Sequence, residues 1–452
     1  MGAGPLTRDT LRTQLWPLPT LGVLLAVAAG VGLPRLDMRI GHHVPQSLTT
    51  YLFGGGPAAA RTVLEAIAGS LISVTALTFS LTVVTLQLAS SQFSPRLLRT
   101  FNQDRYVQAT LALFLATFTY ALTVLRTVRT EADGQPPFVP QLSVTLAFLL
   151  TLASVFALVA FLSHLARKIR VETMLRDVHV AADDTLRRLV PEARPAIPGG
   201  AAGAPEAPGD ARTALSLSAG TSGFLAAVDE KALLAAAIEA DAVVLIDRCP
   251  GSSLIAGTPA GVAWSRTGTP FPPDTRRLLI ERTARALRTT PERTPDQDIS
   301  FGLRQLTDVA TRALSPGVND PTTAIHALSH SSALLCAMAQ RDLSPRRLRD
   351  DRGRVRVVLR RATLAELLHL AVDQPLHYGA ADAAVLSRVT MLLRELAWHS
   401  GPEQRPVVAE HLARLRSAIA TQELHPGDRI RLTDLADSVG QALDGHWTTA
   451  AP

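Results

Sequence analysis

The sequence is poor in charged, aromatic, cysteine and lysine residues. Only 19% of its 452 residues are charged and 5% are aromatic, whereas an ordinary soluble domain carries about 25% charged residues. Two cysteines, Cys249 and Cys336, are too few for a disulfide scaffold. The residues present instead are aliphatic, with 47% hydrophobic residues and a mean hydropathy of +0.18. This composition excludes a disordered chain and argues against an ordinary soluble enzyme.

The positive net charge of +6 does not indicate a nucleic-acid partner. Lys168 and Lys231 are the only lysines, so nearly every basic side chain is an arginine. No zinc-finger or RRM-like string is present, and basic residues are not interleaved with aromatic ones. Part of the basic excess flanks apolar segments, where positive charge marks one side of a membrane. We therefore expect a lipid bilayer, and no nucleic acid, as a partner.

Four apolar stretches are long enough to cross a bilayer, which takes about 20 residues at a rise of about 1.5 Å each. None contains Lys, Arg, Asp or Glu, each of which costs a few kcal/mol at the bilayer centre. After Leu165 the pattern becomes charged and periodic, and no later run is long enough. The predicted spans are Trp16–Leu33, Ala66–Ala89, Val107–Leu125 and Leu142–Leu162.

Arginines that flank the spans predict a multi-pass membrane protein with both termini in the cytoplasm. The loops that carry more Arg and Lys residues, here called the richer set, are expected on the cytoplasmic side. The alternative for the N-terminus is a cleaved signal peptide, with the small residues Ala26-Val27-Ala28 as its cleavage site. The richer set comprises Arg8, Arg12, Arg96, Arg99, Arg105, Arg167, Lys168 and Arg170; the other comprises Arg35, Arg39, Arg61, Arg126 and Arg129.

The second span is unusual because its polar residues fall on two faces. If successive residues turn about 100° around the helix axis, one group of four polar residues spans an arc of about 40°, and a second group of four spans about 80° on the far side of the helix. Such groups either hold helices together in a bundle or line a water-filled path. The first group is Ser73, Ser80, Gln87 and Ser91, the candidate pore or bundle face; the second is Thr75, Thr78, Thr82 and Thr85.

The loop after the second span carries two candidate contact residues, Arg96 and Arg99. Ser94 and Pro95 before them are typical of a helix N-cap and first helical position. The short amphipathic helix that would follow places both arginines at the headgroups, where they either bind anionic lipid or set topology.

The remainder of the chain is predicted to be cytoplasmic and mainly α-helical, with a small β unit. A charged helix leaves the membrane, and the stretch rich in Pro, Gly and Ala that follows it cannot pack a core. Short β-branched runs bounded by Pro-Gly and Gly turns then indicate strands. The expected domains are 1–166 for the four-helix transmembrane domain, 167–210 for the exit helix and linker, 211–272 for the small α+β unit, and 273–452 for a helical domain.

A helix and the turn after it supply the other candidate contact residues. Arg304, Asp308 and Arg312 lie four apart, which forms a ladder on one helix face. In the turn SPGVNDP, Asn319 precedes Asp320, a predicted cap with proline at the first helical position. Ladder and turn either contact a partner or ligand or lock two helices together. The opposite face of the helix, predicted to be buried, comprises Ile299, Leu303, Leu306, Ala310 and Ala313.

Three strings resemble the DUF2254 family of bacterial predicted membrane proteins. They are SLISVTALTFSLTVVTLQLASSQFSPRLLRTF, the FVP before the fourth span, and ISFGLRQLTDVATRALSPGVNDPTTA. The likeness covers nearly the whole chain, and the two long strings are specific. The resemblance implies a multi-span membrane protein with a cytoplasmic C-terminal region, and it implies no biochemical activity.

Enzyme motifs are missing from the sequence, which contains no G-x-S-x-G, Walker A, H-E-x-x-H or paired C-x-x-C. Glu366 and His369 lie three apart with Asp373 and His377 near, but such groups are common on solvated helices, so no metal or other cofactor is predicted. Our preferred hypothesis is a homo-oligomeric channel or permeation protein lined by the second span. The alternatives are a membrane-anchored sensor or scaffold that binds a partner or small ligand and, last, an enzyme at the membrane surface.

Overall fold

The computed structural model describes residues 16–40, 52–92, 104–130, 137–168, 170–193 and 214–447. The chain divides into an N-terminal unit, Met1–Thr173, and a C-terminal unit, Met174–Pro452. Arg96 and Arg99 lie outside the described residues, as do the side chain of Ser91 and most of the predicted linker.

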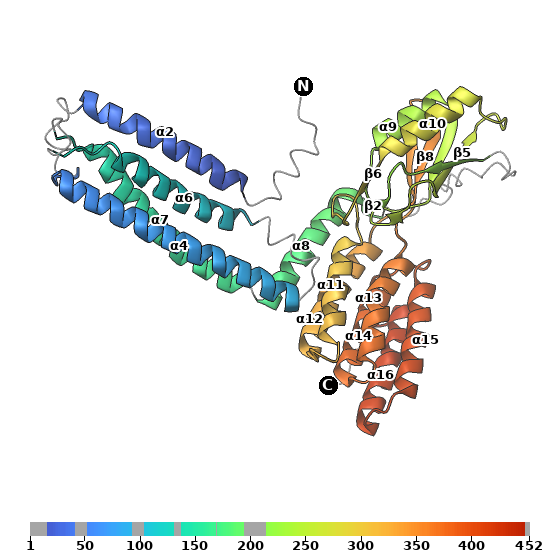
Figure 1. Cartoon of the computed structure of the whole chain (residues 1–452). Coiled ribbons are helices and arrows are strands. Elements are labelled where there is room, and N and C mark those ends of the chain that lie inside the picture. Colours follow the sequence, from blue (N-terminus) through green and yellow to red (C-terminus); the bar gives the residue numbers. More distant parts are fainter. Residues whose placement is uncertain are drawn as a thin grey trace. The chain divides into compact units, whose positions relative to one another are not determined.

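The described residues of the N-terminal unit form four helices that lie side by side (Figure 1). Among the described residues, these four are long and apolar enough to cross a membrane by length and composition, which confirms the predicted apolar stretches. The second is much longer than its predicted span: at about 1.5 Å per residue it extends about 54 Å. The helices are α2 (Pro17–Ile40), α4 (Pro57–Gln92), α6 (Arg105–Leu125) and α7 (Gln141–Lys168).

Close backbone approach and a long-range cap hold these helices together. Gly30 of α2 faces α6 so closely that a Cβ atom there would lie 2.7 Å from the Cβ of Thr123. The carboxylate of Asp37 accepts hydrogen bonds from the backbone N–H groups of Leu142 and Ser143 at 3.2 and 3.1 Å. A carboxylate there satisfies the free N–H groups at the start of α7 and complements the helix dipole.

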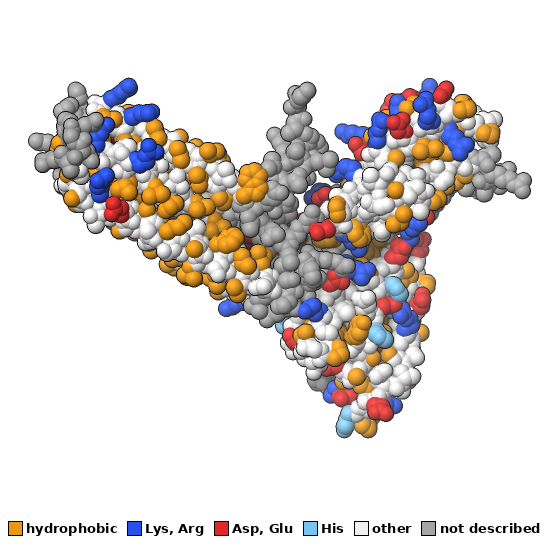
Figure 2. Space-filling model, viewed as in Figure 1, with side chains coloured by type: hydrophobic (Ala, Val, Ile, Leu, Met, Phe, Trp, Pro, Cys, Tyr) orange, Lys and Arg blue, Asp and Glu red, His pale blue; other side chains and the backbone are white. Residues whose placement is uncertain are grey.

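Apolar side chains cover the outside of the N-terminal unit, as the face in Figure 2 shows. Leu77 of α4 is 69% exposed and Phe156 of α7 is 67% exposed. Contiguous exposed apolar surface of this extent is rare on a water-soluble monomer. The distribution is the one expected for helices in contact with lipid.

The C-terminal unit begins within α8 (Val171–Leu189) and contains two β-sheets among its described residues. The larger sheet has the strand order β1-β5-β3-β8-β7, and the smaller has the order β4-β2-β6. In the larger sheet only the β3–β8 pair is parallel. Helices α9 (Glu230–Glu239) and α10 (Pro273–Ala286) contribute to the apolar core of this region. The strands are β1 (Leu215–Ser218), β2 (Gly223–Val228), β3 (Ala242–Ile246), β4 (Ser253–Leu254), β5 (Pro259–Ser265), β6 (Leu287–Thr290), β7 (Arg346–Arg349) and β8 (Val355–Leu359).

Strands β6, β7 and β8 lie in the part of the chain that the sequence predicted to be helical throughout. The reason is that a segment of five residues such as β8, VRVVL, is too short to show a periodicity that separates strand from helix. Its strand form depends on pairing with β3 and β7. The larger sheet therefore takes strands from both sides of the predicted boundary at residue 273.

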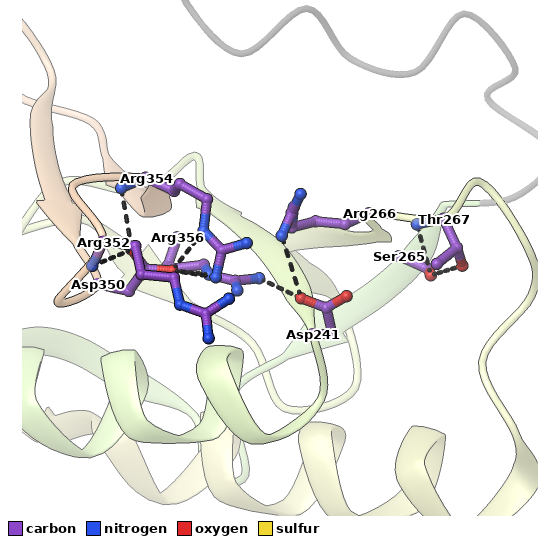
Figure 3. A network of polar contacts seen from close by, with 8 residues as sticks. All are labelled: Asp241, Ser265, Arg266, Thr267, Asp350, Arg352, Arg354 and Arg356. Atoms are coloured by element: carbon purple, nitrogen blue, oxygen red, sulfur yellow. Dashed lines mark hydrogen bonds and ion pairs between the residues drawn. The ribbon is translucent and has the colours of Figure 1, made fainter.

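A buried arginine joins β8 to the rest of its sheet (Figure 3). Arg356 is 3% exposed, and its guanidinium donates to Asp350 at 2.9 Å and to Asp241 at 2.6 Å. Asp350 also accepts backbone N–H groups from the β7–β8 turn, and these bonds hold its pKa well below the ordinary range. Since Asp241 directly precedes β3 and Arg356 lies near the start of β8, the network ties together the N-terminal ends of these two parallel strands.

Six helices pack around one apolar core in the remainder of the C-terminal unit. The predicted face of α11 is confirmed as buried, with Leu303 and Leu306 at zero exposure. A Cβ atom on Gly302 would lie 2.3 Å from the Cβ of Ala182, so α11 approaches α8 at a glycine. The helices are α11 (Phe301–Ala313), α12 (Pro321–Ala339), α13 (Leu364–Gly379), α14 (Ala383–His399), α15 (Arg405–Thr421) and α16 (Pro426–Leu443).

Candidate functional site

The structure separates the two polar faces of α4. All four threonines of the far face are buried. The hydroxyls of Thr75, Thr82 and Thr85 each donate to the backbone carbonyl four residues earlier, at 2.6, 2.8 and 2.8 Å. Polar groups inside the bundle are thereby satisfied within their own helix, and the threonine face packs between helices.

The other polar face of α4 lies on the outside of the N-terminal unit. Ser73, Ser80 and Gln87 are exposed and lie seven residues apart. Small residues at intermediate steps, Gly69 and Ala76, are exposed on the same side. We call these five residues the outer polar stripe. Small and hydroxyl residues repeated at steps of three and four are typical of close helix–helix contacts in membranes.

The SPGVNDP turn ends α11 and starts α12. Asn319 has a positive φ of 49°, a conformation that asparagine tolerates better than most residues. Asp320 is the N-cap of α12, and its carboxylate accepts from the backbone N–H of Thr323 at 3.0 Å and from its hydroxyl at 2.6 Å. These bonds to Thr323 lower the pKa of Asp320. Both oxygens of Asp320 are therefore used in shaping the turn.

The predicted ladder of α11 lies on the side opposite the buried face. Arg304, Asp308 and Arg312 are each half-buried. Their positions leave the ladder accessible to a contact within the C-terminal unit or with a partner.

Three potential metal-ligating side chains meet between α13 and α15, in a set different from the one the sequence grouped. Ligand atoms of His369, Asp373 and His411 all lie within 4.8 Å of one another. Glu366 instead completes the capping box of α13 and pairs with Arg360. Arg414 donates to both oxygens of Asp373, at 2.9 and 2.7 Å. The charge of that carboxylate is thus already compensated by a guanidinium, which disfavours a second cation beside it.

A further feature, which sequence reasoning did not predict, is a cavity of about 320 Å³ in the C-terminal unit. Its walls come from the end of α8, the turns after β3 and β8, and the segment before α11. Apolar wall residues include Leu189, Val228 and Leu359. Five arginines and two carboxylates also line it: Arg188, Arg248, Arg346, Arg360, Arg361, Glu230 and Asp298.

Both carboxylates of the cavity wall are already paired. Glu230 binds Arg346 through two hydrogen bonds of 2.6 and 2.8 Å. Asp298, whose side chain is 1% exposed, accepts from Arg293 at 2.5 and 3.0 Å. Gly251 makes room for this second pair, since a Cβ there would lie 2.1 Å from the Asp298 carboxylate. The remaining charge on the wall is positive.

A thiol also lines the cavity. Cys249 is half-buried, and burial raises its pKa to about 11. A thiol with this pKa is almost wholly protonated near neutral pH, so it is a poor nucleophile. The cavity therefore has the features of a binding site rather than those of a thiol-dependent active site.

Comparison with known proteins agrees with the membrane-like helices. Residues 12–395 match the family model described as predicted membrane protein, DUF2254. Uncharacterized proteins of Mycobacterium bovis and of Mycobacterium tuberculosis are each 34% identical over 450 residues, which covers 98% of this chain and 83% of theirs. No solved structure matches the chain. From the extent of the family match and of these relatives, the chain belongs to the DUF2254 family of predicted membrane proteins.

Proposed function

We propose that the protein is a homo-oligomeric channel or permeation protein of the bacterial inner membrane, in which copies of α4 meet along the outer polar stripe. One observation carries the proposal: Ser73, Ser80 and Gln87 are exposed on a unit whose other outward side chains are largely apolar. The Ser73 hydroxyl donates to the carbonyl of Gly69 at 3.1 Å, whereas the side chains of Ser80 and Gln87 have no hydrogen bond to a described residue. An amide or hydroxyl without a hydrogen-bond partner in hydrocarbon costs on the order of a few kcal/mol. A neighbouring helix or a water-filled path removes that cost.

The small size of the N-terminal unit favours a path between subunits. Among the described residues of α4, the threonines already pack inside, so the outer polar stripe is the face of this helix that is left to line a path. A closed ring of identical helices places one polar residue per subunit at each level. In such a ring Ser73, Ser80 and Gln87 form successive layers.

Disulfide cross-linking tests the assembly. In a Cys249→Ser, Cys336→Ala background, we expect oxidation to join copies through Ser80→Cys but not through Phe79→Cys. Phe79 is an exposed residue of α4 that lies about 100° around the helix from Ser80, and it is the matched control. In liposomes, an impermeant thiol reagent should block ion flux only through the Ser80→Cys protein.

A single-subunit mass in several mild detergents, together with no ion flux from the reconstituted protein, would overturn the proposal. Cross-linking of both cysteine variants to the same extent would also contradict it, because it would indicate random collision. Gel filtration of each variant separates these outcomes from misfolding.

We further propose that both termini lie on the cytoplasmic side, which the arginine distribution supports. Arg167 and Lys168 in the last turn of α7 belong to the richer set of positive flanks. Protease added to sealed right-side-out vesicles should then leave the C-terminal unit intact. Its digestion there would reverse the proposed topology.

A membrane-anchored sensor is the second candidate function. The cationic cavity of the C-terminal unit favours it, because a preformed pocket with a few convergent polar groups is typical of a small-molecule site. Its test is whether a bound small molecule changes the oligomeric state or the ion flux of the full chain.

A further inference from the structure

We propose that the cavity of the C-terminal unit binds a soluble phosphate-bearing small molecule. The inference deepens the second candidate function by naming its ligand class, and it does not depend on assembly through α4. It stands on three arginines of the cavity wall: Arg188, Arg248 and Arg361.

None of these three arginines forms an ion pair with a described carboxylate. Arg361 is half-buried, and its two terminal nitrogens donate to the backbone carbonyls of Asp342 and Leu189 at 2.9 and 3.0 Å. Arg188 donates to the carbonyl of Asp296 at 3.3 Å. Arg248 is exposed and donates to no described residue. Carbonyl oxygens orient a guanidinium but leave its charge uncompensated.

Burial makes the charge of Arg361 unfavourable, whereas Arg188 and Arg248 are exposed. The pKa of Arg361 is lowered, first by desolvation and then by the nearby charge of Arg346. An anion in the cavity would relieve both effects. The nearby carboxylate of Glu230 does not bind Arg361, because both of its oxygens accept hydrogen bonds from Arg346.

The geometry of the wall favours a phosphate group on a small organic body. Guanidinium groups bind phosphate oxygens through paired, charge-assisted hydrogen bonds. Three such groups from separate elements suit the several oxygens and the double charge of a phosphate monoester. The volume of about 320 Å³ lies at the lower end of the range for small-molecule sites. Apolar wall residues such as Val228 and Ile299 would contact the uncharged part.

Cys249 provides a reporter inside the cavity, and Cys336 provides an internal reference elsewhere. Both thiols are half-buried, and burial raises their pKa values to about 11 and about 12. Alkylation by N-ethylmaleimide at mildly alkaline pH can be followed separately at each cysteine by mass spectrometry. The full chain in an uncharged detergent is incubated with pyrophosphate, AMP or ATP at low ionic strength.

We expect at least one of these probes to slow alkylation of Cys249 about tenfold while leaving Cys336 unchanged, the effect of near-saturating occupancy. Arg361→Gln and Arg248→Gln should each weaken this protection about tenfold, the usual effect of losing a charge-assisted hydrogen bond. Arg431→Gln is the matched control, because Arg431 is an exposed arginine paired with Asp428 on α16. It should leave the protection unchanged. Arg248→Gln keeps the test valid if Arg361→Gln fails to fold, since Arg248 supports no described contact.

Three outcomes would overturn the inference. The first is no protection by any probe at millimolar concentration, and the second is equal protection by sodium chloride of the same ionic strength. The third is protection only by dihexanoyl phosphatidylglycerol, which would assign the phosphate to a lipid headgroup. Protection without any change in oligomeric state or flux would support the site and refute the sensor role.

Discussion

The two units of this protein differ in where their aliphatic side chains lie: the N-terminal unit carries them on its outside as well as in its core, and the C-terminal unit mainly in its core. In the N-terminal unit, Leu77 and Phe156 are more than half exposed, whereas threonines of α4 are buried. In the C-terminal unit, Leu393 and Leu396 have zero exposure, and charged side chains cover the surface (Figure 2). The comparison teaches that the surrounding solvent, rather than hydrophobicity alone, decides which face of a helix becomes the core.

Polar contacts differ between the units in the same way. Hydroxyls in the N-terminal unit donate mainly to carbonyls of their own helix, as Thr75 does to Leu71. Side chains in the C-terminal unit instead join separate elements, as Arg356 joins the β7–β8 turn to Asp241. Self-contained hydrogen bonds suit hydrocarbon, where no water replaces a lost partner. Ion pairs between elements suit a unit whose surface is hydrated.

The largest expected effect comes from placing a charge on an exposed aliphatic position in each unit. Leu77→Arg should reduce membrane insertion by about 3 kcal/mol, because α4 would carry a charge into hydrocarbon. Ile430→Arg in α16 is the control, since Ile430 is 63% exposed, similar to Leu77 at 69%. We expect it to leave insertion and folding unchanged. The amount of each variant that stays in the membrane fraction after carbonate extraction measures its insertion. Equal losses for the two variants would remove the distinction between the units.

Replacing a glycine at a close helix–helix contact should lower the free energy of unfolding by a similar amount in both units. Gly30→Val and Gly302→Val each place a side chain against a neighbouring helix, at Thr123 and Ala182 respectively. Overpacking of this kind costs about 1–3 kcal/mol. Thermal unfolding of the full chain in detergent should show the loss. Gly440→Ala is the control, because a Cβ atom there meets nothing within 4 Å.

Removal of a helix cap should have a smaller effect, confined to the C-terminal unit and dependent on pH. Asp320→Ala should cost about 1 kcal/mol of unfolding free energy at neutral pH. The pKa of Asp320 is lowered in the folded state, so its contribution is present above the unfolded pKa of about 4 and is lost as the pH falls through the folded value. Urea unfolding at several pH values should therefore show the difference between wild type and variant shrinking in acid. A difference that grows in acid would contradict the assignment.

The smallest effect is expected from a buried hydroxyl of the N-terminal unit. Thr82→Val keeps the side-chain shape and removes a bond to the carbonyl of Thr78, so it should cost about 0.6 kcal/mol. Thermal unfolding in detergent measures it. A loss of several kcal/mol would show that Thr82 bonds across helices, contrary to the comparison drawn above.

Features that depend on local pattern could be predicted from the sequence. The apolar stretches of α2, α4, α6 and α7 follow from length and the absence of charge. The buried face of α11 follows from its periodicity, and the cap at Asp320 follows from Asp-Pro before a helix. The two polar faces of α4 were also visible, but which of them packs inward was not. That choice depends on neighbouring helices rather than on α4.

Features that depend on pairing between distant segments could not be predicted. The strand β8 pairs with β3, and a five-residue segment such as VRVVL is short enough to fit a helix equally well. Nothing in the sequence around Asp373 indicated that His411 and Arg414 would approach it from α15.

By itself, the sequence determined the number of apolar helices and the helix caps, because a 3.6-residue period and a capping side chain act within a few residues. Only the tertiary structure decided that the threonines of α4 face inward and that Arg188, Arg248 and Arg361 line one cavity. Those outcomes depend on which surfaces exclude solvent together, and the free energy of that exclusion belongs to pairs of elements rather than to any one stretch of chain.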